Sequence, residues 1–301
     1  MKKIILSILM SIPGLLIYAQ DLNINHHPFY RDGVNPGSFI HAPEVNIFVL
    51  YNNEFWGFRE EPNTQILDVS VNLGGMNKLG LMVYNDIIGF DKTQNIKLRY
   101  ARKFEISDRS SFSLGLSPGV IHRNLMATQM LFEQSGVVDP VSLYDRNHTV
   151  FDFDFGGEFR YDSLVVGLST NHLAKSLTKY DSITPTPHYY AYAQYTTSGN
   201  VKFRPNVLFR YWKNTYWVEA GVLVFFNNPF WMGASYTIDH DLTCMAGLKI
   251  LKNKNVNFGY AFKSNMNGQI LRPGSTNSHE IFLNFSFGNG PGQFPLTVRN
   301  L

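Results

Sequence analysis

Long apolar runs are missing from this sequence beyond its first twenty residues. No later segment reaches the roughly 18 consecutive apolar residues that indicate a helix crossing a bilayer. The mean hydropathy of −0.14 is also too low for a helical membrane protein. The sequence therefore predicts no transmembrane helix after the N-terminal stretch.

Cysteine and an excess of charge are also missing. The one cysteine, Cys244, lies in a strand-like run, so we expect a small apolar side chain there and no disulfide framework. The 26 Lys and Arg residues become 24 once Lys2 and Lys3 are set aside, against 23 Asp and Glu. No face or segment concentrates Lys and Arg, so a nucleic-acid partner is not expected. No cofactor is expected either.

Residues 1–19 have the pattern of a secretory signal peptide. Lys2 and Lys3 provide the charge, Ile4–Ile17 is apolar, and Ala19 is the small residue before the expected cleavage point. The apolar stretch is shorter than the roughly 20 residues that a spanning helix needs. We therefore expect export and removal of this segment.

Aromatic residues are abundant, with 24 Phe and 16 Tyr, and they fall in short runs that alternate with polar residues. Phe151, Phe153 and Phe155, for example, alternate with Asp152 and Asp154. Such alternation indicates strands with one apolar and one polar face. The runs are 45–52, 64–73, 77–86, 93–104, 111–124, 149–160, 164–171, 188–195, 200–211, 215–226, 229–238, 241–250, 256–263 and 278–287.

The fourteen runs predict an all-β fold, a 14-stranded antiparallel transmembrane β-barrel of the outer membrane. Tight turns alternate with connections that include three long ones, 125–148, 172–187 and 264–277. A soluble β-sandwich also alternates, but runs of about 9–12 residues fit a tilted bilayer crossing better than soluble strands of about 5–6. Short turns and both termini are then periplasmic, and the long loops face outward.

The expected organisation has a single domain. The barrel occupies 45–287 and is followed by a short irregular tail, 288–301. Residues 20–44 have no clear periodicity. They form either a periplasmic strap or a plug inside the lumen, and the sequence does not separate these two hypotheses.

Several segments resemble the PorP/SprF family of the type IX secretion system of Bacteroidetes. The first is 51–65, Tyr-Asn-Asn-Glu-Phe-Trp-Gly-Phe-Arg-Glu-Glu-Pro-Asn-Thr-Gln, beside a family pattern Tyr-Arg-Asn-Gln-Trp-x-Gly-Phe-x-Gly-Ala-Pro-x-Thr. Similar matches are Gly80-Leu81, 85–89, Gly167-Leu168-Ser169, His172-Leu173, Pro205, Arg210-Tyr211, 231–236 and Ser278-His279-Glu280-Ile281. Departures include Asn52, where the family often has Arg, and Arg59-Glu60-Glu61 in place of a Gly-Ala-like pair.

This resemblance implies an outer-membrane barrel for secretion or cell-surface attachment of large cargo proteins, including gliding adhesins. It implies partners that carry a type IX C-terminal domain, other components of the secretion system, and outer-membrane lipid. It implies no enzyme activity. A porin or small-solute transporter of the same shape, and a barrel hydrolase with Ser and His at its rim, are the competing hypotheses.

The first outward loop supplies the candidate partner-binding residues Glu54, Phe55, Trp56, Phe58 and Arg59. Exposed aromatic residues beside charges are typical of contact sites. The competing interpretation is that the loop folds back over the lumen, or that its rings lie in the aromatic belt of the membrane interface. The long loops 125–148 and 264–277 are further candidates, because functional residues on rigid scaffolds are often in loops.

Four short patterns are interpreted as structural rather than catalytic or metal-binding. Gly115-Leu116-Ser117-Pro118-Gly119 matches a nucleophile elbow, but it lies within a strand and proline offers no N–H for an oxyanion hole. Asp154-Phe155-Gly156 lacks the other kinase motifs. His26-His27 and Asp239-His240-Asp241 lack further ligands at metal-binding spacing. The sequence therefore predicts no catalytic or metal site.

Overall fold

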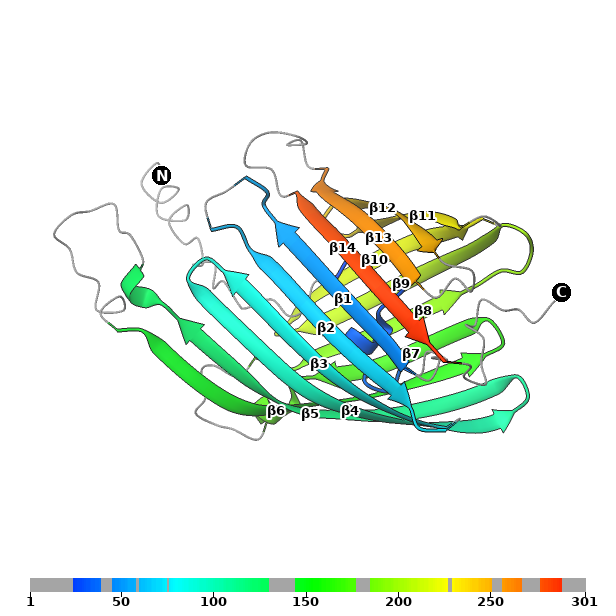
Figure 1. Ribbon diagram of the computed structural model, residues 1–301, viewed down its shortest axis with the longest axis horizontal. Helices are drawn as coiled ribbons and strands as arrows, with labels where there is room; N and C mark the ends of the chain where they lie inside the picture. The colour runs from blue at the N-terminus through cyan, green and yellow to red at the C-terminus, as the bar shows by residue number, and fades with distance from the viewer. Residues whose placement is uncertain are drawn as a thin grey trace, which may run out of the picture.

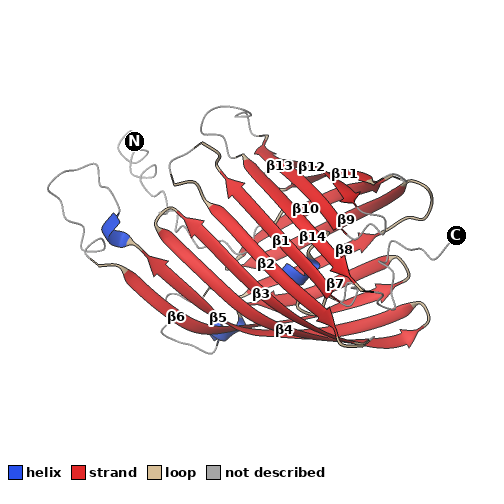
Figure 2. Cartoon of the chain, in the orientation of Figure 1, coloured by secondary structure: helices blue, strands red, loops and turns tan. Residues whose placement is uncertain are grey.

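Antiparallel strands close into a barrel in the computed structural model (Figures 1 and 2), which describes residues 24–38, 45–57, 60–74, 76–129, 144–176, 185–226, 229–250, 256–266 and 277–288. The described residues contain fourteen strands, and each pairs with its neighbours in sequence. They are β1 (Val45–Glu54), β2 (Asn63–Asn72), β3 (Asn77–Ile88), β4 (Asp91–Ser107), β5 (Ser110–Leu125), β6 (Arg146–Tyr161), β7 (Leu164–Asn171), β8 (His188–Tyr195), β9 (Lys202–Trp212), β10 (Thr215–Phe225), β11 (Phe230–Thr237), β12 (Asp241–Ile250), β13 (Val256–Asn265) and β14 (Ser278–Phe287).

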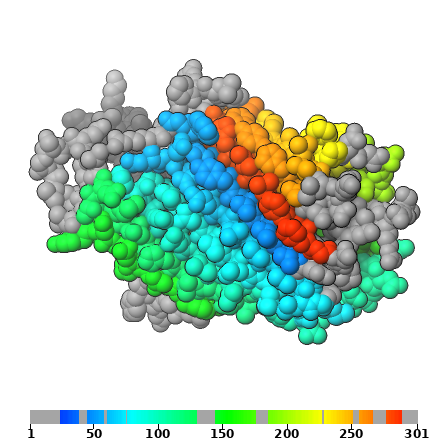
Figure 3. Space-filling model, viewed as in Figure 1, coloured from blue at the N-terminus to red at the C-terminus, as the bar shows by residue number. Residues whose placement is uncertain are grey.

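The first and last strands close the barrel. β1 pairs with β14 along its whole length, from Val45 opposite Phe287 to Glu54 opposite Ser278. Figure 3 shows blue β1 lying against red β14 on the surface. Closure leaves no free strand edge, which a bilayer requires of any β-structure that spans it. The predicted 14-stranded barrel is confirmed.

Alternating side chains separate the lipid face from the lumen. On β5, Leu114 and Leu116 are exposed, whereas Ser113 and Ser117 are buried inside. On β14, Ile281 faces outward and Glu280 inward. The predicted division into two faces is confirmed on β5, β6 and β14. Separately, none of the helices in the described part of the chain is long and apolar enough to span a membrane.

Strand limits match the predicted runs closely except on β4 and β6. β4 covers 91–107 and β6 covers 146–161, beyond the predicted 93–104 and 149–160. Residues 146–149 are exposed on both faces. Alternation fails there because neither face is covered, although the backbone ladder with β5 continues to Arg146. Hydropathy thus marks the half-buried part of a strand, not its hydrogen-bonded end.

Residues 24–38, named the plug from here on, lie inside the lumen. They include the short 3-10 helix η1 (Arg31–Gly33), seen within the barrel in Figure 2. The ring of Tyr30 stacks on that of Phe48 from β1, with centroids 4.3 Å apart. Phe29 packs on Trp231 and Phe282 at 4.5 and 5.3 Å. The hydrophobic core of the molecule therefore lies between the plug and the inner wall, and these described residues form a plug rather than a strap.

Candidate functional site

The outer end of the plug is bound to two strands by carboxylates. Glu280 on β14, fully buried, accepts hydrogen bonds from the backbone N–H groups of Asn25 and His26 at 2.9 and 2.8 Å. Its Oε1 atom is also 2.5 Å from Nδ1 of His26. Nε2 of His27 lies 3.6 Å from Glu219 on β10. Both histidines of the His26-His27 pair thus face wall carboxylates.

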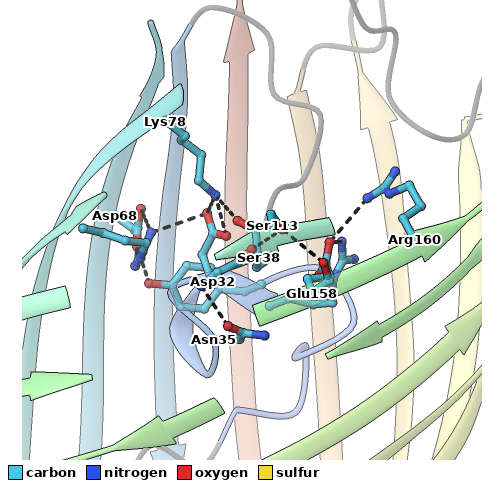
Figure 4. Close-up of polar contacts among 12 residues, drawn as sticks. Asp32, Asn35, Ser38, Asp68, Lys78, Ser113, Glu158 and Arg160 are labelled. Carbon is cyan, nitrogen blue, oxygen red and sulfur yellow. Dashed lines mark hydrogen bonds and ion pairs between the residues drawn. The ribbon is translucent and has the colours of Figure 1, made fainter. Parts of the chain in front are cut away.

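The middle of the plug forms an ion pair with one strand of the wall and a hydrogen bond with another (Figure 4). Arg31 donates from Nε to Glu158 of β6 at 2.9 Å, and Nη2 of Arg160 lies 3.5 Å from the same carboxylate. Tyr30 donates its hydroxyl hydrogen to Asp68 of β2 at 2.6 Å. The plug therefore contacts β2 and β6 at once.

Asp32 completes this ionic contact on β3 and β4. Nζ of Lys78, a side chain only 1 % exposed, is 2.8 Å from Asp32 and donates to the carbonyl of Ser38 at 2.5 Å. Nη1 of Arg99 lies 3.4 Å from Asp32. An unpaired buried charge costs several kcal/mol, so these side chains stabilise the barrel and plug only together.

Glycines in the wall let the backbone of the plug approach closely. A Cβ at Gly115 would lie 2.1 Å from the carbonyl oxygen of Pro36, and one at Gly156 would lie 2.1 Å from Oδ1 of Asn35. Asn35 in turn donates to the carbonyl of Gly157 at 2.9 Å. The Gly115–Gly119 and Asp154–Gly156 patterns thus include glycines whose observed role is contact with the plug.

A group of acidic residues and a histidine surrounds an ammonium group rather than a vacant site. Nζ of Lys97 is 2.9 Å from Asp152 and 2.6 Å from Asp154. Nδ1 of His172 is 2.7 Å from Asp152. Asp152, Asp154 and His172 have metal-ligating atoms close together. Because Lys97 already supplies the positive charge, the arrangement is that of an internal ion cluster.

Above the plug, an outer vestibule of about 350 Å³ opens between the outward ends of the strands. Its lining residues come from seven strands and three connections, and they mix aromatic rings with charges of both signs. They are Glu54, Phe55, His188, Arg210, Trp212, Thr215, Tyr216, Trp217, Asp239, Asp241, Lys263, Asn265, Asn277 and Ser278.

A stack of planar groups forms one wall of the outer vestibule. The guanidinium of Arg210 lies 5.0 and 4.8 Å from the ring centroids of Trp212 and Trp217. The ring of His188 stacks on that of Trp212, with centroids 5.5 Å apart. Arg210 and Trp217 also line a cavity of about 10 Å³ with Ile24 and His27 of the plug. The plug therefore lies directly beneath the vestibule.

The structure separates the candidate residues of the first outward loop. Glu54 and Phe55 line the outer vestibule, and the N–H of Phe55 donates to the carbonyl of Asn277 at 2.7 Å. Trp56 is 65 % exposed, and its ring lies 4.9 Å from His279, which Tyr260 and Phe262 also contact. Trp56 is thus beside an outer-rim aromatic group and away from the lumen. Phe58 and Arg59 lie outside the described residues.

Glu61 fixes the described part of this loop. Its carboxylate accepts hydrogen bonds from the Gly57 N–H at 3.0 Å and the Asn53 side chain at 2.7 Å. These two bonds, the Gly57 bond first, lower the pKa of Glu61 below its ordinary value. The charged form of Glu61 therefore helps to hold Phe55 and Trp56 in place.

The stacked wall and the plug contacts could not be identified from the sequence. Arg210 was noted only as part of a segment that resembles the family. Nothing in the sequence pattern around Trp212 and Trp217 indicated a site, apart from the residue type itself. For the plug there was a usable signal: Arg99 and Glu158 are charges on lumen-facing strand positions and need partners, and the aperiodic segment 20–44 contains Arg31 and Asp32.

Comparison with known proteins identifies the family. Residues 18–285 match the model of the type IX secretion system membrane protein PorP/SprF. The chain belongs to the PorP/SprF family. The match covers the plug and nearly the whole barrel, so both are part of the family pattern. This PorP/SprF protein is thus an outer-membrane β-barrel of the type IX secretion system family.

Solved barrels resemble this PorP/SprF protein in fold. The monoaromatic hydrocarbon channel CymD aligns with a TM-score of 0.55 at 11 % identity, covering 89 % of this chain and 94 % of CymD. The Pseudomonas putida toluene transporter TodX aligns with a TM-score of 0.51 at 10 % identity, covering 89 % and 94 %. No curated protein matches the sequence. At such low identity the likeness is one of fold alone.

Proposed function

We propose that this protein takes part in secretion or cell-surface attachment of large cargo proteins, through protein–protein contacts and without a catalytic step. The observation that supports this most is a lumen occupied by an ion-paired plug beneath an open outer vestibule, in a chain of the PorP/SprF family. Such a barrel presents a rigid outer face for binding.

The outer vestibule has the chemistry of a protein contact site. Interface hot spots are enriched in Trp, Tyr and Arg. The vestibule contains all three, in Trp212, Tyr216 and Arg210, and Tyr216 is 61 % exposed. Contacts on this surface need no movement of the plug.

The proposed partners are cargo proteins with a type IX C-terminal domain, gliding adhesins among them, and other components of the secretion system. Glu54 and Phe55 would contact a partner from inside the outer vestibule. Trp56, with Phe58 and Arg59 further along the same loop, would contact it from the rim. Outer-membrane lipid surrounds the barrel wall.

Two alternatives are less well supported. A porin or small-solute transporter needs a passage through the lumen, where the plug forms buried ion pairs with the wall. The channel and transporter activities of CymD and TodX belong to those proteins. A hydrolase at the rim is not favoured by Ser117, which is buried on β5 within the membrane-spanning wall.

Affinity purification of the tagged protein from its native outer membrane tests the proposal. Mass spectrometry should find a type IX cargo or secretion component bound to the parent protein. Phe55→Ala and Trp56→Ala should each reduce that recovery, because truncation of a hot-spot ring costs about 2 kcal/mol or more.

Tyr161→Ala is the matched control, since Tyr161 is a half-exposed ring at the periplasmic end of β6. Each variant must keep the gel shift between unboiled and boiled samples that reports a folded barrel. Recovery of every partner by folded Phe55 and Trp56 variants would remove this loop from the contact site. A parent protein that retains no secretion component would contradict the proposed function.

A further inference from the structure

Strands β4, β5 and β6 extend beyond the apolar part of the wall at their outward ends. Figure 1 shows β5 and β6 reaching past the neighbouring strands. On the outer face of these three strands the last exposed apolar residues are Ile96, Val120 and Phe151, which lie side by side in the ladders. The next positions outward on this face are all polar: Gln94, His122, Thr149, Lys92, Asn124 and Asn147. Because the wall that faces lipid is apolar, the sheet continues from there into water.

In this outward part, β6 has a partner strand on one side only. It pairs with β5 along its whole length, as far as Arg146. Its ladder with β7 stops at Phe155, close to the end of β7 at Asn171. Within the described part of the chain, residues 146–154 therefore have no strand on the side away from β5.

The hairpin between β6 and β7 shows which backbone groups point to this open side. Tyr161 and Leu164 flank a two-residue turn, so they exchange both backbone hydrogen bonds. Because the direction of these groups alternates along a strand, the odd-numbered residues of β6 point away from β5. The N–H of Asp162 donates to the carbonyl of Arg109 on the β5 side, as this alternation requires. At the outward end, the residues that point to the open side are Asn147, Thr149 and Phe151.

The backbone groups of these three residues have no partner on the open side within the described ranges. Residues 146–149 are also exposed to solvent. Further in, the edge is occupied, because the N–H of His172 donates to the carboxylate of Asp154 at 3.0 Å and η4 (Leu173–Ser176) lies beside β6. Residues 146–151 are named the open edge.

The open edge lacks the features that keep exposed strands from pairing. Natural proteins protect such edges with proline, lysine or a bulge. The open edge reads Arg-Asn-His-Thr-Val-Phe, without proline or lysine, and its register with β5 has no shift. Thr149, Val150 and Phe151 are residue types that favour strands. Its length also matches that of an ordinary strand, about 5–6 residues.

A second copy of this chain does not fit the open edge. Strands of a membrane barrel tilt by about 35–45°, so two upright copies related by a two-fold axis along the membrane normal would cross these edges at about 70–90°. Such a crossing allows neither parallel nor antiparallel pairing. Lipid offers no row of alternating donors and acceptors. The occupant that fits is an extended segment of another polypeptide.

We propose that the open edge of β6 binds an extended segment of a partner protein as an additional antiparallel strand. Main-chain hydrogen bonds supply the affinity in this mode of recognition, and side chains beside the edge supply selectivity. A carboxylate on the segment would lie opposite Arg146, which is exposed and forms no ion pair within the described ranges. The outer vestibule has no lining residue from β4, β5 or β6, so this is a separate contact. It rests on the proposed function only for the kind of partner.

Fluorescence anisotropy with a labelled strand peptide tests the proposal on the full-length protein in neutral detergent. The probe is a hexapeptide of alternating valine and threonine whose last residue is replaced by glutamate, which lies opposite Arg146 in an antiparallel pair. It should bind saturably. The same peptide with every amide N-methylated should not bind, because it has no backbone donor left.

Thr149→Pro should weaken binding about tenfold or more, because it removes an N–H from the centre of the open edge and leaves a peptide carbonyl without its donor. Thr149→Ala is the matched control: it keeps the N–H and should bind within about twofold of the parent. Each variant must retain the heat-dependent gel shift. An edge strand tolerates proline where the N–H faces outward. If Thr149→Pro loses the shift, Asn147→Pro and Asn147→Ala replace the pair.

Hydrogen exchange of the parent protein, resolved to single residues, tests the open edge without a variant. The amides of Asn147 and Thr149 should exchange fast and be slowed by the peptide, whereas those of His148 and Val150, which point to β5, should be slow throughout. Slow exchange at Asn147 and Thr149 in the free protein would overturn the proposal, because the edge would then already be covered.

Three results in the binding assay would also overturn it: no saturable binding, equal binding of the N-methylated peptide, or equal loss in the proline and alanine variants. Self-association of the parent protein that Thr149→Pro abolishes would assign the edge to a second copy instead. The assay contains no cargo. Its failure therefore contradicts the open-edge proposal alone, and the proposed function is judged separately by recovery of secretion components.

Discussion

A single methyl group decides whether the plug fits against the wall at Gly115. The position where a Cβ would lie is 2.1 Å from the carbonyl oxygen of Pro36 and 2.6 Å from the nitrogen of Gly37, and both are backbone atoms. Backbone cannot move aside as the end of a long side chain can. Packing in protein interiors is dense enough that such an overlap must displace one of the two segments.

Gly115→Ala should therefore loosen the plug without unfolding the barrel. Hydrogen exchange followed by mass spectrometry should show faster exchange in residues 35–38, because their backbone is pushed off the wall. Gly80→Ala is the control, since the atom nearest to its Cβ would be Nη1 at the flexible end of the Arg99 side chain, at 3.1 Å, and the nearest backbone atom would be 3.6 Å away. Equal protection of 35–38 in both variants would mean that the close approach at Gly115 is not important.

Glu61 makes the first outward loop sensitive to acid. The pKa of Glu61 in the folded loop is below its ordinary value. The stabilisation that the charged carboxylate gives to the loop is therefore complete above the ordinary pKa and is lost as the pH falls through the folded pKa. Ordinary glutamate titrates at about 4.3. Tryptophan emission should therefore change below that pH as the loop releases Trp56, and Glu61→Gln, which keeps an oxygen acceptor, should lack this transition. Identical titrations of the two proteins would contradict the assignment.

Strands and plug differ in how far the sequence predicts them. Alternation placed most strands within one or two residues, because each strand has one face in lipid and one in the lumen. The plug has no periodicity, since its side chains go to different walls: Asp32 to β3 and Arg31 to β6, 46 and 127 residues away. Such pairings depend on closure of the whole barrel, so a local pattern cannot predict them.

The Arg31–Glu158 pair gives a test of the plug as an element. Arg31→Leu should destabilise the protein by about 3–5 kcal/mol, because it leaves a buried carboxylate with fewer partners. The double variant Arg31→Leu/Glu158→Leu should recover much of this loss, because it removes both charges. Urea unfolding of the protein reconstituted in lipid measures the three stabilities. Additive losses in the double variant would show that the two side chains do not act as a pair.

In the whole molecule, the strands of the barrel wall could be predicted from the sequence, whereas the contacts inside the lumen could not. The number of strands and the closure of the barrel were predicted from the sequence, because contact with lipid requires apolar and polar residues to alternate. The family was predicted because its motif at 51–65 is one continuous segment. The outer vestibule could be predicted only in part. Glu54 and Phe55 were identified, but Arg210 and Trp212 were not, because seven strands bring its lining together. The choice between strap and plug likewise needed the three-dimensional arrangement.

Planar-bilayer recording tests most directly whether this barrel is a closed scaffold for protein contacts. The purified parent protein should show little or no steady conductance, because the plug is held by buried ion pairs on β3 and β6 and by hydrogen bonds to carboxylates on β2 and β14. A variant lacking residues 24–38 that still gives the heat-dependent gel shift should open stable channels. Large and stable conductance by the parent protein, unchanged by deletion of the plug, would contradict the account and favour a diffusion pore.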